Sequence, residues 1–247
     1  MERASASGIP ARPADASSAQ GKRKPLNDRL IALAISVVCT LLGLAACGGG
    51  GGTFIPPRVQ TQILSDFRFD GDIEQLSATS FIVTQGMTPT IQSVFAGIDP
   101  TTGHEFRAFL TFPLSGSNGV PINAIIDSAF LEILVNNLIP GNGSIPVRVE
   151  LVSFQPPTLI PSDFDRTALP PLAAVLISGN VTSADIGNFV PVDVTSLMIR
   201  AQQLGLIDFQ VRIMLDLGPP IFTLMEIDDT TAPDRAQRAP LLTVTYH

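Results

Sequence analysis

Two groups of acidic residues are the candidates for chemistry in this chain, because of their type and their spacing. The groups comprise Asp66, Asp70, Asp72 and Glu74 near the start of the chain's second quarter, and Glu226, Asp228, Asp229 and Asp234 near its end. Oxygen-rich loops suit Ca²⁺, which takes six to eight oxygen ligands. Neither group has EF-hand spacing, and solvated turn acids are the simpler interpretation. We therefore expect no resident cofactor, and we keep calcium as an alternative with Asp66, Asp70, Asp72, Asp228 and Asp229 as its ligands.

The sequence gives little support for catalysis that depends on histidine, serine or cysteine. The chain has two histidines, His104 in an expected turn, where we expect it to be exposed, and His247 at the end. A serine or cysteine hydrolase needs a base held against its nucleophile, and zinc needs several converging ligands. Two carboxylates could hydrolyse a glycosidic bond, but nothing in the sequence selects one pair. We predict that the protein is not an enzyme, with a carbohydrate-active enzyme using such a pair as the alternative.

One arginine lies within a strongly alternating segment. Residues 105–114 read EFRAFLTFPL, so Arg107 shares a face with Phe109, while Phe106 and Ala108 share the other. Such alternation is typical of a strand. We expect Arg107 to pair with an aspartate and fix the strand register, and a role in ligand binding is the alternative.

The only cysteine chemistry lies near the N-terminus. Basic residues from Lys22 to Arg29 precede an apolar run of fifteen residues from Leu30 to Leu44, which is short for a membrane span of about 20 residues. Leu44-Ala45-Ala46-Cys47 resembles the lipobox of bacterial lipoproteins. The resemblance implies cleavage before Cys47 and attachment of acyl chains to its thiol. Residues 1–46 are then a signal peptide with an extended n-region.

Residues 47–57 are expected to tether the lipidated cysteine to the folded domain. Five glycines, Gly48 to Gly52, favour flexibility because they lack side chains. In lipoproteins an aspartate after the cysteine favours the inner membrane. Here Gly48 follows Cys47, so we expect a cell-envelope location on the outer membrane if the cell has one, with the domain outside the cytoplasm and the membrane as its partner through the acyl chains.

The remaining chain is acidic. Residues 48–247 contain nineteen acidic residues, nine arginines and no lysine, a net charge of −10. Such a surface repels nucleic acid, so we expect no nucleic-acid partner. A polysaccharide or an envelope protein remains as a candidate partner.

Residues 58–247 read as one all-β domain. Period-two alternation and turn residues predict strands in eight segments: 81–84, 92–96, 105–114, 125–135, 147–151, 209–215, 221–227 and 241–246. One short helix is predicted after Asp193 and Thr195, with Leu197 and Ala201 on its apolar side and Gly205 at its end. Residues 156–171 read as a long loop. Many short strands suggest a β-sandwich.

Four landmarks in order resemble the DNRLRE-type domain family. They are Phe106 to Phe112, Val120 to Ile133, Val192 to Leu197 and Ala239 to Tyr246. The resemblance implies a jelly-roll-like sandwich of a kind found on bacterial surface proteins and beside carbohydrate-active enzymes, and some members bind acidic polysaccharides. The chain departs from the family in lacking tryptophan and in placing Arg238 one residue further from the closing Pro240. We predict a non-catalytic module for adhesion, envelope structure or glycan binding.

Overall fold

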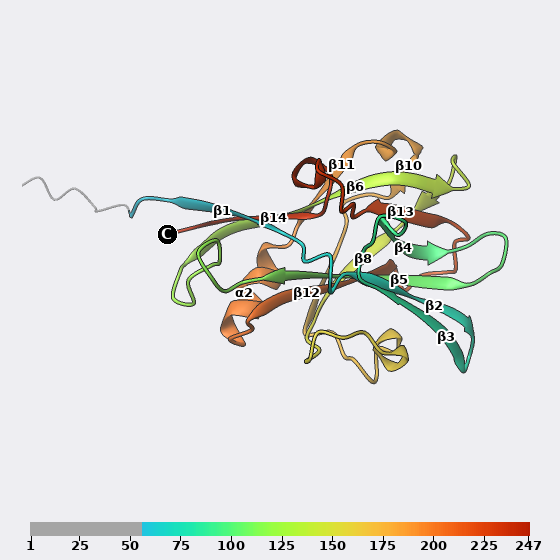
Figure 1. The fold of residues 1–247 in the computed structure, drawn as a ribbon, viewed down its shortest axis with the longest axis horizontal. Helices are drawn as coiled ribbons and strands as arrows, with labels where there is room; N and C mark the ends of the chain where they lie inside the picture. The colour runs from blue at the N-terminus through green and yellow to red at the C-terminus, as the bar shows by residue number, and fades with distance from the viewer. Residues whose placement is uncertain (1–55) are drawn as a thin grey trace, which may run out of the picture. The chain divides into compact units, whose positions relative to one another are not determined.

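The computed structural model describes residues 56–247, and these residues form an antiparallel β domain with one short α-helix (Figure 1). The strands of the first half are β1 (Val59–Leu64), β2 (Gly71–Ser77), β3 (Ser80–Gln85), β4 (Ser93–Ile98), β5 (Glu105–Pro113), β6 (Ile126–Ile139), β7 (Ser144–Ile145) and β8 (Val147–Val152). The strands of the second half are β9 (Ala173–Leu176), β10 (Val181–Thr182), β11 (Phe189–Asp193), β12 (Asp208–Leu215), β13 (Leu224–Asp228) and β14 (Leu241–Tyr246). The helix is α2 (Thr195–Gln203), and three 3-10 turns are η1 (Pro161–Phe164), η2 (Ser183–Asp185) and η3 (Arg235–Gln237).

Twelve strands belong to one curled sheet, and the long strand β6 joins its two halves. The first part of β6 pairs with β14 and β11, and its last part pairs with β13. Beyond β13 the order continues through β4, β5, β12, β8 and β9, with the β2–β3 hairpin attached to β5. The sheet therefore curls into two facing layers, which confirms the predicted all-β, sandwich-like fold. Within residues 56–247 no helix has the length and hydrophobicity of a membrane span.

The main core lies between the two layers. Alternate residues of each strand point inward, as period two requires. On β5 these are Ala108, Leu110 and Phe112, all fully buried. Helix α2 closes one end of the core with Leu197 and Met198.

A second, smaller core covers the other face of β5. Ile73 and Phe109 pack there against Phe154, Leu159 and Phe164 from the segment after β8. Residues 153–170, yellow in Figure 1, lie along this face and contain η1. The predicted loop is thus a cover over apolar side chains, which explains why both faces of β5 are hydrophobic.

Candidate functional site

A polar hollow of about 390 Å³ opens over β2, β4, β5 and β13, and we call it the carboxylate pocket. Three acids line it: Asp72 and Glu74 from β2 and Glu226 from β13. Two phenyl rings, Phe95 and Phe106, lie beside them with centroids 5.9 Å apart. Smaller polar and apolar side chains complete the wall: Thr84, Thr90, Ile91, Gln92 and Ser93.

Strand register brings these residues together from distant parts of the chain. Glu74 lies opposite Phe106 across β2 and β5, and Glu226 lies opposite Phe95 across β13 and β4. Gly97 of β4 lies opposite Phe106 of β5, so the β4–β5 pairing brings the two residue pairs next to each other. Gly97 has a φ of +120°, and a Cβ there would collide with the carbonyl oxygen of Thr223. Strand β4 therefore requires glycine at this position, two residues after Phe95.

The three carboxyl groups of the pocket differ in their surroundings. Asp72 is 5% exposed, and its Oδ2 accepts a hydrogen bond from the Phe95 amide at 3.2 Å. Burial raises the pKa of Asp72 to about 7, and the charge of Glu74 adds to this effect. Glu226 Oε1 accepts a bond from the Ser93 hydroxyl at 2.7 Å. Asp72 therefore carries a proton on part of the molecules at neutral pH, and the pocket offers both carboxylate acceptors and one acid.

His104 contacts one of the pocket acids, Glu74. Its Nδ1 lies 2.7 Å from Glu74 Oε1, and its side chain is 28% exposed. The expectation of an exposed turn histidine is therefore wrong. Sequence reasoning missed this pair because thirty residues separate its members. Period two did offer a partial signal, since it places Asp72 and Glu74 on one face of a strand.

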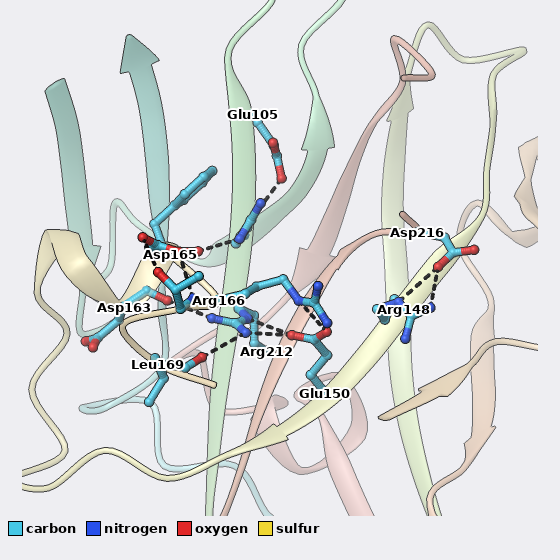
Figure 2. Close-up of polar contacts among 12 residues, drawn as sticks. Glu105, Arg148, Glu150, Asp163, Asp165, Arg166, Leu169, Arg212 and Asp216 are labelled. Carbon is cyan, nitrogen blue, oxygen red and sulfur yellow. Dashed lines mark hydrogen bonds and ion pairs between the residues drawn. The ribbon is translucent and has the colours of Figure 1, made fainter. Parts of the chain in front are cut away.

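A buried arginine cluster lies on the opposite face of β5, beneath residues 153–170 (Figure 2). Arg212 and Glu150 are both fully buried, and Arg212 Nη2 lies 2.6 Å from Glu150 Oε2. The second oxygen of Glu150 accepts a bond from Arg166 Nε at 2.9 Å. Arg212 also donates to the carbonyl oxygens of Asp163 and Leu169 at 2.9 and 3.1 Å. The cluster thus fixes the covering segment to the sheet.

Arg107 belongs to the same region and also holds the covering segment. Its Nε donates to Glu105 Oε1 at 2.8 Å, and its Nη1 donates to the carbonyl oxygen of Phe164. Its guanidinium carbon lies 3.9 Å from the centroid of the Phe164 ring, a cation–π contact. The predicted aspartate partner is therefore wrong, because the next acid on the same face of β5 is a glutamate. The geometry favours positioning of the segment over ligand binding.

Two acids from distant parts of the sequence are both buried in the interior of the domain. Asp70 and Asp229 are fully buried. Asp70 Oδ1 accepts a bond from the Thr111 amide at 2.7 Å, and Asp229 Oδ1 lies 2.6 Å from Arg235 Nη1. Burial raises the pKa of both carboxyls, and the charge of Asp229 raises that of Asp70 further. The second oxygen of each carboxyl has no hydrogen-bond partner among residues 56–247.

The five predicted calcium ligands do not converge on one point. Asp66 is held by Arg68 and Asp228 by Arg238, each in two contacts. Asp70 and Asp229 form the buried pair, and Asp72 lies in the carboxylate pocket. No three His, Cys, Asp or Glu side chains of the described domain are placed to hold a metal ion. The calcium alternative stays a prediction, without support from these contacts.

Cys47, the lipobox and the glycine tether lie outside the described residues. The anchor therefore stays a prediction from the sequence.

A scan against models of protein families finds no match to this chain, and a search of curated proteins finds none either. The resemblance to DNRLRE-type domains therefore stays a prediction that rests on the residues given above.

Proposed function

We propose that the chain is a lipid-anchored protein of the bacterial cell envelope whose β domain binds a glycan without transforming it. The observation that carries the proposal is the carboxylate pocket, where Phe95 and Phe106 lie beside Asp72, Glu74 and Glu226. A phenyl ring can cover the apolar face of a sugar ring. Carboxylate oxygens accept hydrogen bonds from its hydroxyl groups. Apolar and aromatic walls combined with a few convergent polar groups are typical of small-ligand sites.

The charge of the pocket selects the class of glycan. Three acids line it, and residues 48–247 carry a net charge of −10. A sugar with carboxylate or sulfate groups would be repelled, whereas a neutral sugar or an amino sugar would not. We therefore propose neutral or amino-sugar polysaccharide as the partner, in place of the acidic polysaccharide that the family resemblance implies. An adhesive or structural role in the envelope would depend on the same binding of glycan in the carboxylate pocket.

A glycan-binding assay tests this proposal on the mature protein. The probes are neutral, amino-sugar and acidic oligosaccharides immobilised on an array. We expect binding to one of the first two classes, weakened about tenfold or more by Phe106→Leu or by Glu226→Gln. Asp216→Asn is the matched control, because Asp216 pairs with Arg148 outside the pocket. Binding confined to acidic probes, or unchanged in both pocket variants, would contradict the proposal.

The pKa of Asp72 supports a second candidate, a glycoside hydrolase. A general acid near neutrality and a second carboxyl group are what such an enzyme requires, and Glu226 or Glu74 would be the second group. The non-catalytic function is preferred because Asp72 is 5% exposed and its carboxyl already accepts a bond from Phe95. Release of reducing ends from a bound glycan, abolished by Asp72→Asn with binding retained, would establish the enzyme instead.

A further inference from the structure

The most exposed large apolar side chains of the described domain gather at one end. Ile122, Ile207 and Ile125 are 74%, 63% and 61% exposed, the highest fractions among such residues in 56–247. They lie on two segments, the connection between β5 and β6 and the turn after α2. Exposed apolar groups that gather in one place mark a contact with a protein or a membrane.

Hydrogen bonds hold these two segments side by side. The Gln202 side chain of α2 donates to the carbonyl oxygens of Pro121 and Ala124 at 3.1 and 2.8 Å. Ile122 and Ile207 line one shallow hollow of about 230 Å³. The apolar end, defined by Ile122, Ile125 and Ile207, is therefore one surface on a fixed support.

The chain joins the domain at this same end. Ile125 and His247 exchange two backbone hydrogen bonds of 2.8 and 3.1 Å. Tyr246, next to His247, lies opposite Val59 at the start of β1. In Figure 1 the start of β1, the C-terminus, α2 and the β5–β6 connection all lie at the left of the molecule.

The length of chain before β1 limits how far this end can lie from a lipidated Cys47. Cys47 and Pro56 are nine positions apart in the sequence, and nine residue steps span at most about 30 Å when fully extended. A short link of this kind gives a tethered surface a high effective concentration, about millimolar, against the surface to which it is anchored. Weak apolar contacts are then sufficient for binding.

The charges at this end also fit a lipid surface. Residues 114–126 and 201–207 contain no charged side chain, although residues 48–247 carry a net charge of −10. Arg58, whose side chain is 73% exposed, lies beside the apolar end and pairs with Asp127. The two acids that flank this end are also engaged, Asp127 by Arg58 and Asp208 by the Gln155 side chain, so anionic headgroups would meet reduced repulsion here.

We propose that the apolar end docks on the bilayer surface, with Ile122, Ile125 and Ile207 inserted among the lipid headgroups. The docking rests on the proposed anchor at Cys47. It orients the domain, so that the carboxylate pocket, on strands that extend towards the right of Figure 1, faces away from the membrane. Shallow insertion of apolar side chains is the usual mode of interfacial binding.

Site-directed labelling of the mature lipidated protein tests the docking. Beyond Cys47 the chain has no cysteine, so Ile122→Cys and Ile207→Cys each provide a unique site for a polarity-sensitive fluorophore. Leu217→Cys is the matched control. Leu217 is 54% exposed and lies just after the last residue of β12, whereas Ile207 lies just before its first residue. The two sites are therefore at opposite ends of one strand. The protein is placed in vesicles of phosphatidylethanolamine and phosphatidylglycerol, and flotation of the vesicles measures anchoring separately.

We expect the labels at residues 122 and 207 to shift to the blue and to be quenched by a lipid-borne quencher, and the label at residue 217 to stay in water. Protein that floats with the vesicles while all three labels stay in water would overturn the docking and leave the anchor intact. Protein that does not float would overturn the anchor and, with it, the docking. Shielding that rises with protein density at fixed lipid would assign the surface to a second copy of the chain and overturn the docking.

Discussion

At the scale of single residues, Asp72 links the pocket to the stability of the domain. Burial raises the pKa of Asp72 to about 7 from an ordinary value of 3.8. The folded state therefore binds this proton more tightly than the unfolded state does. The resulting stabilisation is complete below about pH 4 and is lost as the pH rises through 7. The loss amounts to a few kcal/mol, because each unit of pKa shift corresponds to about 1.4 kcal/mol. The raised pKa values of Asp70 and Asp229 act in the same direction.

Urea unfolding at pH 5 and pH 8 measures this effect. We expect the free energy of unfolding to be higher at pH 5, and the difference to shrink in Asp72→Asn, which carries no ionisable group at this position. Glu132→Gln is the control, because Glu132 lies on β6 between β14 and β11, outside the pocket. Equal stability of the unsubstituted protein at the two pH values would contradict the assignment of buried, protonated acids.

Calcium gives a second prediction at this scale. Asp228 and Asp229 contact Arg238 and Arg235, so a calcium ion would have to displace these arginines. We expect CaCl₂ to raise the melting temperature no more than NaCl of equal ionic strength does, because both only screen surface charge. An ion that bound only the folded state would add about 2.7 kcal/mol at a hundredfold excess over its Kd. A calcium-specific rise that is lost in Asp228→Asn or Asp229→Asn would establish a metal site.

At the scale of elements, one buried ion pair holds residues 153–170 on the sheet. Glu150→Gln leaves Arg212 fully buried without its carboxylate. Loss of one partner from such a pair costs about 3–5 kcal/mol. We expect Glu150→Gln to lower the free energy of unfolding by about this amount and to expose residues 153–170 to limited proteolysis.

The matched control for this variant is a more exposed pair in the same sheet. Arg148 and Asp216 lie 2.8 Å apart with side chains 21% and 25% exposed, and Figure 2 shows them to the right of the buried cluster. Such pairs contribute about 0–1 kcal/mol. Asp216→Asn should therefore have little effect, and an equal loss in both variants would show that burial is not what matters here.

Elements also show what could be predicted from the sequence. Alternation located β5, β8, β12 and β14, and capping residues located α2, because these signals are local. Alternation did not predict β11, because Pro191 argues against a strand. The structure tolerates Pro191 because β11 pairs only with β6 and is an edge strand.

The carboxylate pocket could not be predicted in the same way. Asp72 and Glu226 both appear in the acid-rich groups of the sequence, but only the pairing of β2, β5, β4 and β13 brings them together. Phe106 lies on the same face of β5 as the core residue Ala108, so alternation alone does not separate a pocket residue at the end of a strand from a core residue. The contacts of Arg107 with Phe164 could not be predicted either, because Phe164 belongs to a loop that is distant in the sequence.

At the scale of the whole molecule, the predicted anchor decides where the domain works. Only a thiol accepts the lipid, so Cys47→Ser should abolish lipidation and leave uncleaved or unanchored protein. Metabolic labelling with a fatty acid and partition into detergent measure the outcome. A variant that still enters the detergent phase at the mature mass would contradict the lipobox interpretation, whereas the fold of residues 56–247 should be unchanged in either case.

The pairing of β1 with β14 determines how the molecule carries mechanical load. A pull between an anchor before Val59 and a ligand in the carboxylate pocket acts along β1, since β1 begins at one end of the long axis and the strands of the pocket extend towards the other (Figure 1). All the residue pairs from Val59–Tyr246 to Leu64–Leu241 are then loaded in shear at the same time. Strands pulled in shear must break their hydrogen bonds together, whereas strands peeled apart break them one by one. If the proposed anchor and ligand are both engaged, the pairing of the first and last strands would therefore let this domain bear force between them.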